Sequence, residues 1–161
     1  MLLFRSPTQR HLDTALTVLR VVLGLVFIMH GGQKLFVYGF AGVSGSFAQM
    51  GIPAAGFFGP FVSLVEFFGG IALVLGLLTR LAALGLAATM VVAILTVHLK
   101  AGFFNPNGVE FPLSLLASAI TLAITGAGAF SLDALIGKRL GGETAADSVP
   151  AAAPARTRRV A

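Results

Sequence analysis

Cysteine is missing from the 161-residue chain. This absence excludes a disulfide framework, a thiolate metal site and a cysteine nucleophile, so any redox chemistry needs a bound molecule. Charged residues are also scarce, at 11% of the chain, compared with about 25% in soluble domains. Because 57% of the residues are hydrophobic, this shortage is typical of a membrane protein. The length leaves no room for a sizeable second domain.

Nucleotide-binding and hydrolase motifs are absent as well. The glycine-rich stretch 39–45 (GFAGVSG) has no preceding strand and no following Lys-Ser or Lys-Thr pair, so it does not predict a phosphate-binding loop. The first four residues are too short for the apolar part of a cleavable signal, and we expect the first apolar segment to be retained. The sequence therefore offers no self-contained catalytic motif and leaves open whether the protein is an enzyme.

Four apolar segments predict an all-α fold, an integral membrane four-helix bundle. A helix that spans a bilayer needs about 20 mostly apolar residues. Four candidate spans are present, at 14–37, 57–78, 81–99 and 110–130. We expect a transmembrane domain over 14–137, a short lead at 1–13 and a basic, disordered tail at 138–161. The Gly- and Phe-rich connection 38–60 is expected at the membrane interface, with a short helix near 44–50.

Basic residues favour one orientation of this bundle. A net charge of +5 would suggest nucleic acid in a soluble protein, but here the basic residues flank apolar segments and predict contact with anionic lipid instead. Four spans put both termini on one side, and only Lys34 and Lys100 fall on the other. The remaining basic residues are Arg5, Arg10, Arg20, Arg80, Lys138, Arg139, Arg156, Arg158 and Arg159. The positive-inside rule therefore predicts that both termini lie in the cytoplasm.

An internal repeat is visible in the apolar segments. Residues 19–26 (LRVVLGLV) resemble 79–87 (TRLAALGLA), and 55–60 (AGFFGP) resemble 101–106 (AGFFNP). The pattern predicts two helical hairpins in the same orientation, which would be a parallel repeat about an axis along the membrane normal.

Ionisable residues interrupt the first two predicted spans. Arg20, His30 and Lys34 share one face of the first span at 100° per residue, and Glu66 lies near the middle of the second. An ionised group inside a membrane costs about 2.5 kcal/mol or more, so each of these residues needs a partner. Two interpretations are open and can overlap. Arg20 and Glu66 form a buried ion pair that fixes the helix register, or the same groups line a ligand or proton site.

A second polar cluster is expected near the outer face of the membrane. Depth along the spans brings His30, Lys34, His98 and Glu110 together there, above Glu66. Lys34 is also explained by a side chain that extends to the outer headgroups, and we favour that explanation. His and Glu pairs can hold a metal, and two His can ligate a haem, but no tight local motif supports either.

A quinone is the more economical ligand for this cluster. It needs an apolar slot between helices and one or two donors to its carbonyl oxygens, which His, Lys or Arg can supply. The 14 phenylalanines would line such a slot, or would act only as anchors at the membrane interface.

Residues 16–133 resemble the DoxX family of small four-span bacterial membrane proteins, and the resemblance implies a multi-pass protein of the bacterial inner membrane. The residues that carry the resemblance are LRVVLGLVFIMHGGQKLF at 19–36, GIP at 51–53, the run from Glu66 through TRLAA at 79–83, VHLKAGFF at 97–104, GVEFPL at 108–113 and GAGAFSLD at 126–133. No single segment is specific, but the joint pattern is.

The family is named for a small subunit of a thiosulfate- or quinol-linked membrane oxidoreductase. The resemblance therefore implies an accessory or quinone-contacting subunit, with redox partner subunits in the same membrane. A family role that depends on thiols would not transfer to a chain without cysteine. The alternatives are a small transporter or proton-coupled channel, and a membrane scaffold for partner proteins. A homo-oligomer is compatible with each of these.

Overall fold

The computed structural model describes residues 7–141, and helices account for most of this part of the chain. The lead and tail residues predicted on either side, 1–6 and 142–161, lie outside the described residues. The α-helices are α1 (Gln9–Gly32), α2 (Gly39–Gln49), α3 (Ala55–Leu75), α4 (Thr79–Ala93), α5 (Glu110–Thr125) and α6 (Leu132–Gly141). Within 7–141 there is no strand, which confirms the predicted all-α fold.

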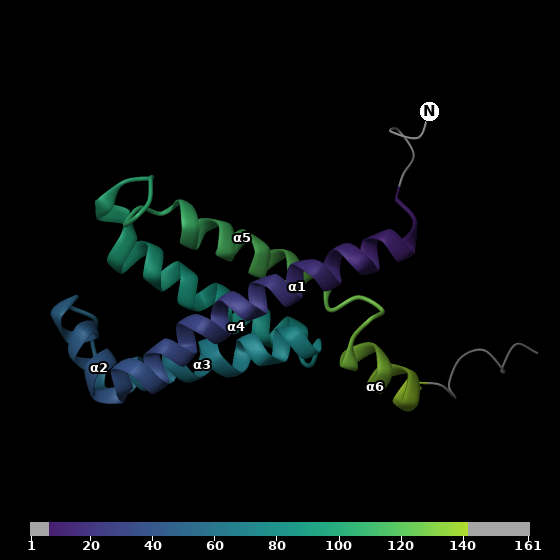
Figure 1. The fold of residues 1–161 in the computed structure, drawn as a ribbon, viewed down its shortest axis with the longest axis horizontal. Helices are drawn as coiled ribbons and strands as arrows, with labels where there is room; N and C mark the ends of the chain where they lie inside the picture. The colour runs from purple at the N-terminus through teal and green to yellow at the C-terminus, as the bar shows by residue number, and fades with distance from the viewer. Residues whose placement is uncertain (1–6, 142–161) are drawn as a thin grey trace, which may run out of the picture.

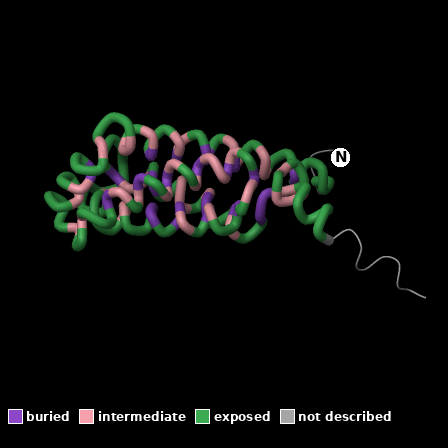
Figure 2. Tube along the Cα trace, turned by 90° about the horizontal axis from the view of Figure 1, so that it is seen from below, coloured by how far each residue is buried: buried purple, intermediate pink, exposed green. Residues whose placement is uncertain are grey.

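The four long helices run back and forth along one common direction (Figure 1). α1 packs along α3, and α4 packs along α5, while α3 and α4 join the two pairs. The core between them includes Leu23, Phe27, Leu73, Leu86 and Leu122. Figure 2 shows this buried stripe inside a largely exposed surface. Because that exposed surface is rich in large apolar side chains, the bundle has the pattern expected of a protein surrounded by lipid.

Three of the helical segments are long and apolar enough to cross a membrane. They are Gln9–Gln49, Ala55–Leu75 and Thr79–Ala101. α5 is shorter, at 16 residues, and covers about 24 Å at 1.5 Å per residue. The predicted fourth span continued to residue 130, but the helix ends at Thr125 because Gly126 has a φ of +84°, which the right-handed helix does not allow.

The connection between α1 and α3 is more helical than its glycines predict. α1 continues through a π-helical segment, Gln33–Tyr38, and the chain then turns at Gly39, whose φ is +65°, into α2. α2 then packs on α3. α4 also continues through a π-helical segment, Ile94–His98. At the other end of the chain, the predicted disordered tail began at 138, whereas α6 keeps residues 138–141 helical.

Glycines allow α1 and α3 to pack closely. A Cβ atom added to Gly24 would lie 2.6 Å from the carbonyl oxygen of Gly70, and one on Gly31 would lie 2.4 Å from the backbone nitrogen of Phe67. Both distances are far below van der Waals contact, so only glycine fits at these positions. Small residues commonly bring helices together in this way in membranes.

The predicted repeat holds for one pair of segments and fails for the other. Arg20 of α1 and Arg80 of α4 each lie beside the glycine that ends a neighbouring helix: Gly76 after α3 and Gly126 after α5. The AGFF segments, in contrast, differ in structure. The first opens α3, whereas the second ends the α4 segment and enters the loop before α5.

Candidate functional site

Glu66 forms an ion pair with Lys34, which corrects the predicted Arg20–Glu66 pair. The Glu66 side chain is 3% exposed and that of Lys34 is 24% exposed. Lys34 therefore turns inward to a buried carboxylate and does not extend to the headgroups. The pair joins the end of α1 to the middle of α3 and satisfies the one acidic group that α3 buries.

Arg20 has backbone partners at the opposite end of the bundle. Its guanidinium donates to the carbonyl oxygens of Leu73 at 3.0 Å and Val74 at 2.5 Å, and to that of Phe130. The first two belong to the last turn of α3, where carbonyl oxygens run out of helical donors, and that of Leu73 also accepts from the backbone nitrogen of Gly76 at 3.1 Å. Arg20 therefore caps α3 and attaches it to the segment between α5 and α6.

Two aspartates that the sequence analysis did not single out complete this end of the bundle. Asp133 accepts hydrogen bonds from the backbone nitrogens of Leu78 at 2.7 Å and Thr79 at 2.9 Å. A carboxylate there stabilises the positive N-terminal end of α4. Asp13 accepts from the backbone nitrogen of Ala129 at 3.0 Å. Asp133 closes the GAGAFSLD motif, but no local spacing indicates its distant partners.

The predicted outer cluster is divided among separate interactions. His98 Nδ1 lies 2.8 Å from the carbonyl oxygen of Asn107, and Glu110 accepts from the backbone nitrogen of Asn105 at 2.7 Å. These two side chains hold the loop between α4 and α5, while Lys34 pairs with Glu66. No group of three His, Asp or Glu side chains within 7–141 is arranged to hold a metal ion.

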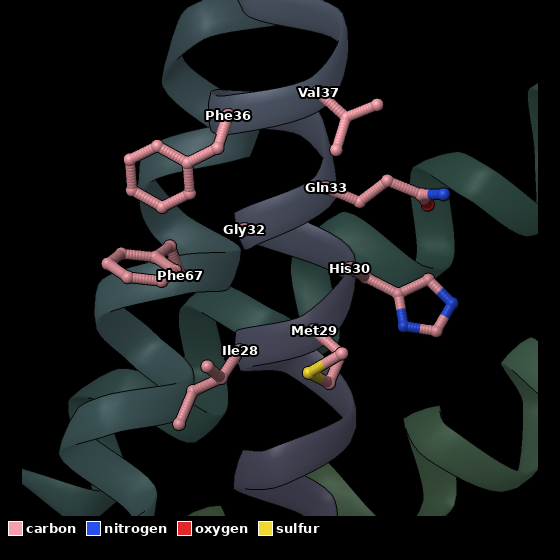
Figure 3. A pocket seen from close by; sticks show the side chains of 8 residues that line it. All are labelled: Ile28, Met29, His30, Gly32, Gln33, Phe36, Val37 and Phe67. Carbon is pink, nitrogen blue, oxygen red and sulfur yellow. The ribbon is translucent and has the colours of Figure 1, made fainter.

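His30 is exposed and borders a groove on the surface of the bundle (Figure 3). The groove has a volume of about 580 Å³. His30 and Gln33 point to one side of α1, and Phe36 and Phe67 point to the other. The lining residues are Ile28, Met29, His30, Gly32, Gln33, Phe36, Val37 and Phe67. The groove is therefore an apolar surface with two polar side chains at one flank.

The hydrogen bond of His30 to its own helix fixes what the other ring nitrogen can do. Nδ1 lies 2.8 Å from the carbonyl oxygen of Val26. Because a carbonyl only accepts, Nδ1 carries the proton of that bond, and Nε2 of the neutral ring is left as an acceptor. The ring also lies 6.0 Å, between centroids, from the ring of Phe111 on α5. α5 thus contributes to the environment of His30.

Gln33 stands beside His30 with a complementary function. It is exposed, three residues further along the helix, and its amide offers both a donor and an acceptor. Gln33 was not among the predicted site residues, although its i, i+3 spacing from His30 is the signal that identifies it. On the opposite flank, the rings of Phe36 and Phe67 meet edge to face with centroids 5.5 Å apart. The groove thus offers an aromatic wall and a polar edge.

Comparisons with known proteins identify the family. The sequence model of DoxX matches residues 15–99, and that of the TQO small subunit DoxD matches residues 59–150. A Bacillus subtilis protein named "Putative oxidoreductase CatD" is 35% identical over 130 residues, which cover 80% of this chain and 92% of that protein.

Two further relatives are membrane proteins by name. The inner membrane protein YqjF of Escherichia coli is 36% identical over 79% of this chain and 95% of its own length. An uncharacterized membrane protein of Mycobacterium tuberculosis is 39% identical over 75% of this chain and 80% of its own. No solved structure matches the chain. The matches and the helical bundle show that this multi-pass membrane protein belongs to the DoxX family.

Proposed function

We propose that the protein is a quinone-contacting accessory subunit of a membrane oxidoreductase system. One observation carries the proposal: the groove beside α1 combines a lipid-accessible apolar surface with the exposed pair His30 and Gln33. A quinone complements such a surface, because it has an apolar ring and tail and two polar carbonyl oxygens. It also dissolves in the bilayer and can enter a groove that opens to lipid.

The two polar side chains suit the two redox forms of such a ligand. Gln33 donates an N–H to a carbonyl oxygen of the quinone. Nε2 of neutral His30 accepts a hydrogen bond from a hydroxyl of the quinol and takes its proton on oxidation. Oxidation of a quinol to a quinone releases two electrons and two protons. In the proposed system both electrons pass to a redox partner subunit, His30 takes one proton, and water at the membrane surface takes the other.

Lys34 and Glu66 support this site without contacting the ligand. Their charges neutralise each other inside the bundle. Lys34 directly follows Gln33 in the chain. The pair fixes the start of the π-helical segment Gln33–Tyr38, which presents Gln33, Phe36 and Val37 to the groove. Short π-helical segments are often found at functional sites.

The names of the matching proteins support the coarser part of the proposal, a subunit of an oxidoreductase. CatD carries an oxidoreductase name, and the DoxD model is that of a small subunit. We extend both to this chain as part of the proposal. The proposed orientation has the Arg10, Arg80 and Lys138 end in the cytoplasm by the positive-inside rule, which puts the groove in the outer half of the membrane.

Quinone binding by the purified protein tests the proposal. We expect the double variant His30→Leu and Gln33→Leu to bind a short-tailed quinone about 30-fold more weakly, because two hydrogen bonds of about 1 kcal/mol each are lost. Thr96→Leu, an exposed substitution on the α4 segment away from the groove, is the matched control and should bind normally. Equal affinity of the double variant and the control would reject the site.

A further inference from the structure

A second pocket lies at the opposite end of the bundle from His30. It has a volume of about 530 Å³ and is formed by the start of α4 and the link between α5 and α6. Thr79, Arg80 and Leu81 contribute from α4, Gly126 and Ser131 from the link, and Asp133 from α6. α3 ends, α4 begins and α5 ends here, so the pocket lies at the helix ends and not along the apolar length of the bundle.

The two arginines related by the internal repeat have very different surroundings. A Cβ atom on Gly76 would lie 3.0 Å from Arg20 Cζ, and one on Gly126 would lie 3.3 Å from Arg80 Nε. Arg20 is 4% exposed and donates to three carbonyl oxygens. Arg80 is exposed and forms no ion pair or side-chain hydrogen bond within residues 7–141. The second half of the repeat therefore leaves the donors of its guanidinium free.

Asp133 lies in the same pocket but is already engaged. Both of its carboxylate oxygens accept backbone N–H groups at the start of α4, so its charge is compensated by the end of that helix. Thr79 also lines the pocket. Its side chain is fully buried, and its hydroxyl has no hydrogen-bond partner within 7–141. An arginine and an unpartnered hydroxyl thus meet at one pocket.

We propose that this pocket binds the phosphate group of a membrane phospholipid. The guanidinium of Arg80 is planar and donates two parallel hydrogen bonds to phosphate oxygens, and Thr79, whose buried hydroxyl has no partner within 7–141, lines the same pocket. Leu78 and Leu81 are 61% and 67% exposed beside these groups, and they contact the acyl chains of the same lipid. Lys138 and Arg139 in the last turn of α6 add positive charge at this end of the bundle.

Lipid retention by the intact chain tests this site. The delipidated protein is incubated with phosphatidylglycerol, or with diacylglycerol of the same acyl chains, and the bound lipid is counted by native mass spectrometry. We expect retention of phosphatidylglycerol at least tenfold above that of diacylglycerol. Equal retention of the two lipids by the unmodified protein would overturn the proposal, whatever the variants do.

Two variants locate the site. Arg80→Gln should lose at least nine-tenths of the retained phosphatidylglycerol, whereas Arg10→Gln, an exposed arginine of α1 at the same end, should retain it. Arg80→Lys keeps the charge without the paired geometry and should give an intermediate value. Retention by Arg80→Gln equal to that of Arg10→Gln would overturn the assignment. Displacement of the lipid by millimolar inorganic phosphate would identify a soluble phosphate as the ligand and overturn the lipid source.

Discussion

Lys34 and Glu66 form the one ion pair that residues 7–141 contain, and its burial determines what it does. Two charges inside a low-dielectric bundle stabilise each other only as a pair, and removal of one leaves the other without compensation. Glu66 is the more buried partner. Leaving the Glu66 carboxylate unpaired therefore costs more free energy than leaving the Lys34 ammonium unpaired.

This dependence makes a double-variant prediction. Lys34→Met should lower the free energy of unfolding by about 3 kcal/mol, because an unpaired carboxylate stays inside the bundle. Adding Glu66→Leu should recover most of that loss, because no charge is then buried. Thermal unfolding in detergent of the wild type, both single variants and the double variant measures the coupling. A double variant as unstable as the sum of its single variants would contradict the pairing.

At the residue level, the sequence showed which side chains needed partners but not which partners they have. The predicted Arg20–Glu66 pair is wrong. Glu66 lies level with Lys34, its partner, and Arg20 precedes Lys34 by 14 residues, which places it about 21 Å away along the helix. Arg20 therefore reaches the end of α3, where carbonyl oxygens take its donors. Side-chain pairing rules do not include such backbone partners, since they depend on where the neighbouring helix ends.

At the level of the helices, close contact between α1 and α3 rests on glycine. Gly31→Ala should lower the free energy of unfolding by about 1–3 kcal/mol, because the new methyl group would lie against the backbone of Phe67 and push the helices apart. Gly45→Ala is the matched control. It lies in α2 with no atom within 4 Å of the added Cβ, and alanine favours helix.

Chemical or thermal unfolding of the two glycine variants in the same detergent gives the comparison. If Gly31→Ala were as stable as Gly45→Ala, the helices would not pack as closely as the structure has them. Small residues in apolar segments indicate close helix packing in general. They did not indicate which glycine faces which backbone, because that depends on the relative rotation of α1 and α3.

Helix boundaries were the least predictable part of the secondary structure. The segment from 39 to 49 contains Gly39, Gly42 and Gly45, yet forms α2. Glycine disfavours a helix by about 1 kcal/mol each in water, whereas a membrane or its interface penalises any unsatisfied backbone group by more. The π-helical segments Gln33–Tyr38 and Ile94–His98 have no sequence signal of this kind, because they depend on tertiary packing.

For the whole molecule, hydropathy was sufficient to predict the architecture. In lipid, a long apolar segment must satisfy its own backbone hydrogen bonds, which an α-helix does. The length and composition of the apolar segments therefore predicted the all-α bundle. The groove at His30 was less predictable. It is formed by side chains on both flanks of α1 together with Phe67 of α3, and hydropathy has no information on that arrangement.

Orientation in the membrane is a prediction about the whole molecule. A phosphatase that is active only in the periplasm, fused after Ala161, should be inactive, and a fluorescent protein that folds only in the cytoplasm should be bright at the same position. The excess of Lys and Arg at that end of the bundle is the physical reason. Insertion of the phosphatase at Gly102, in the exposed loop between α4 and α5, should give the opposite result. Activity of the phosphatase at Ala161 would reverse the proposed orientation.

Contact with a quinone is the central claim, and native mass spectrometry of the protein taken from its own membrane in mild detergent tests it most directly. This measurement detects bound small molecules, partner subunits and copy number together. The account predicts a retained quinone on the wild-type chain and its loss from the His30→Leu, Gln33→Leu variant. A wild-type chain that carries phospholipid alone, from a membrane with abundant quinone, would contradict it.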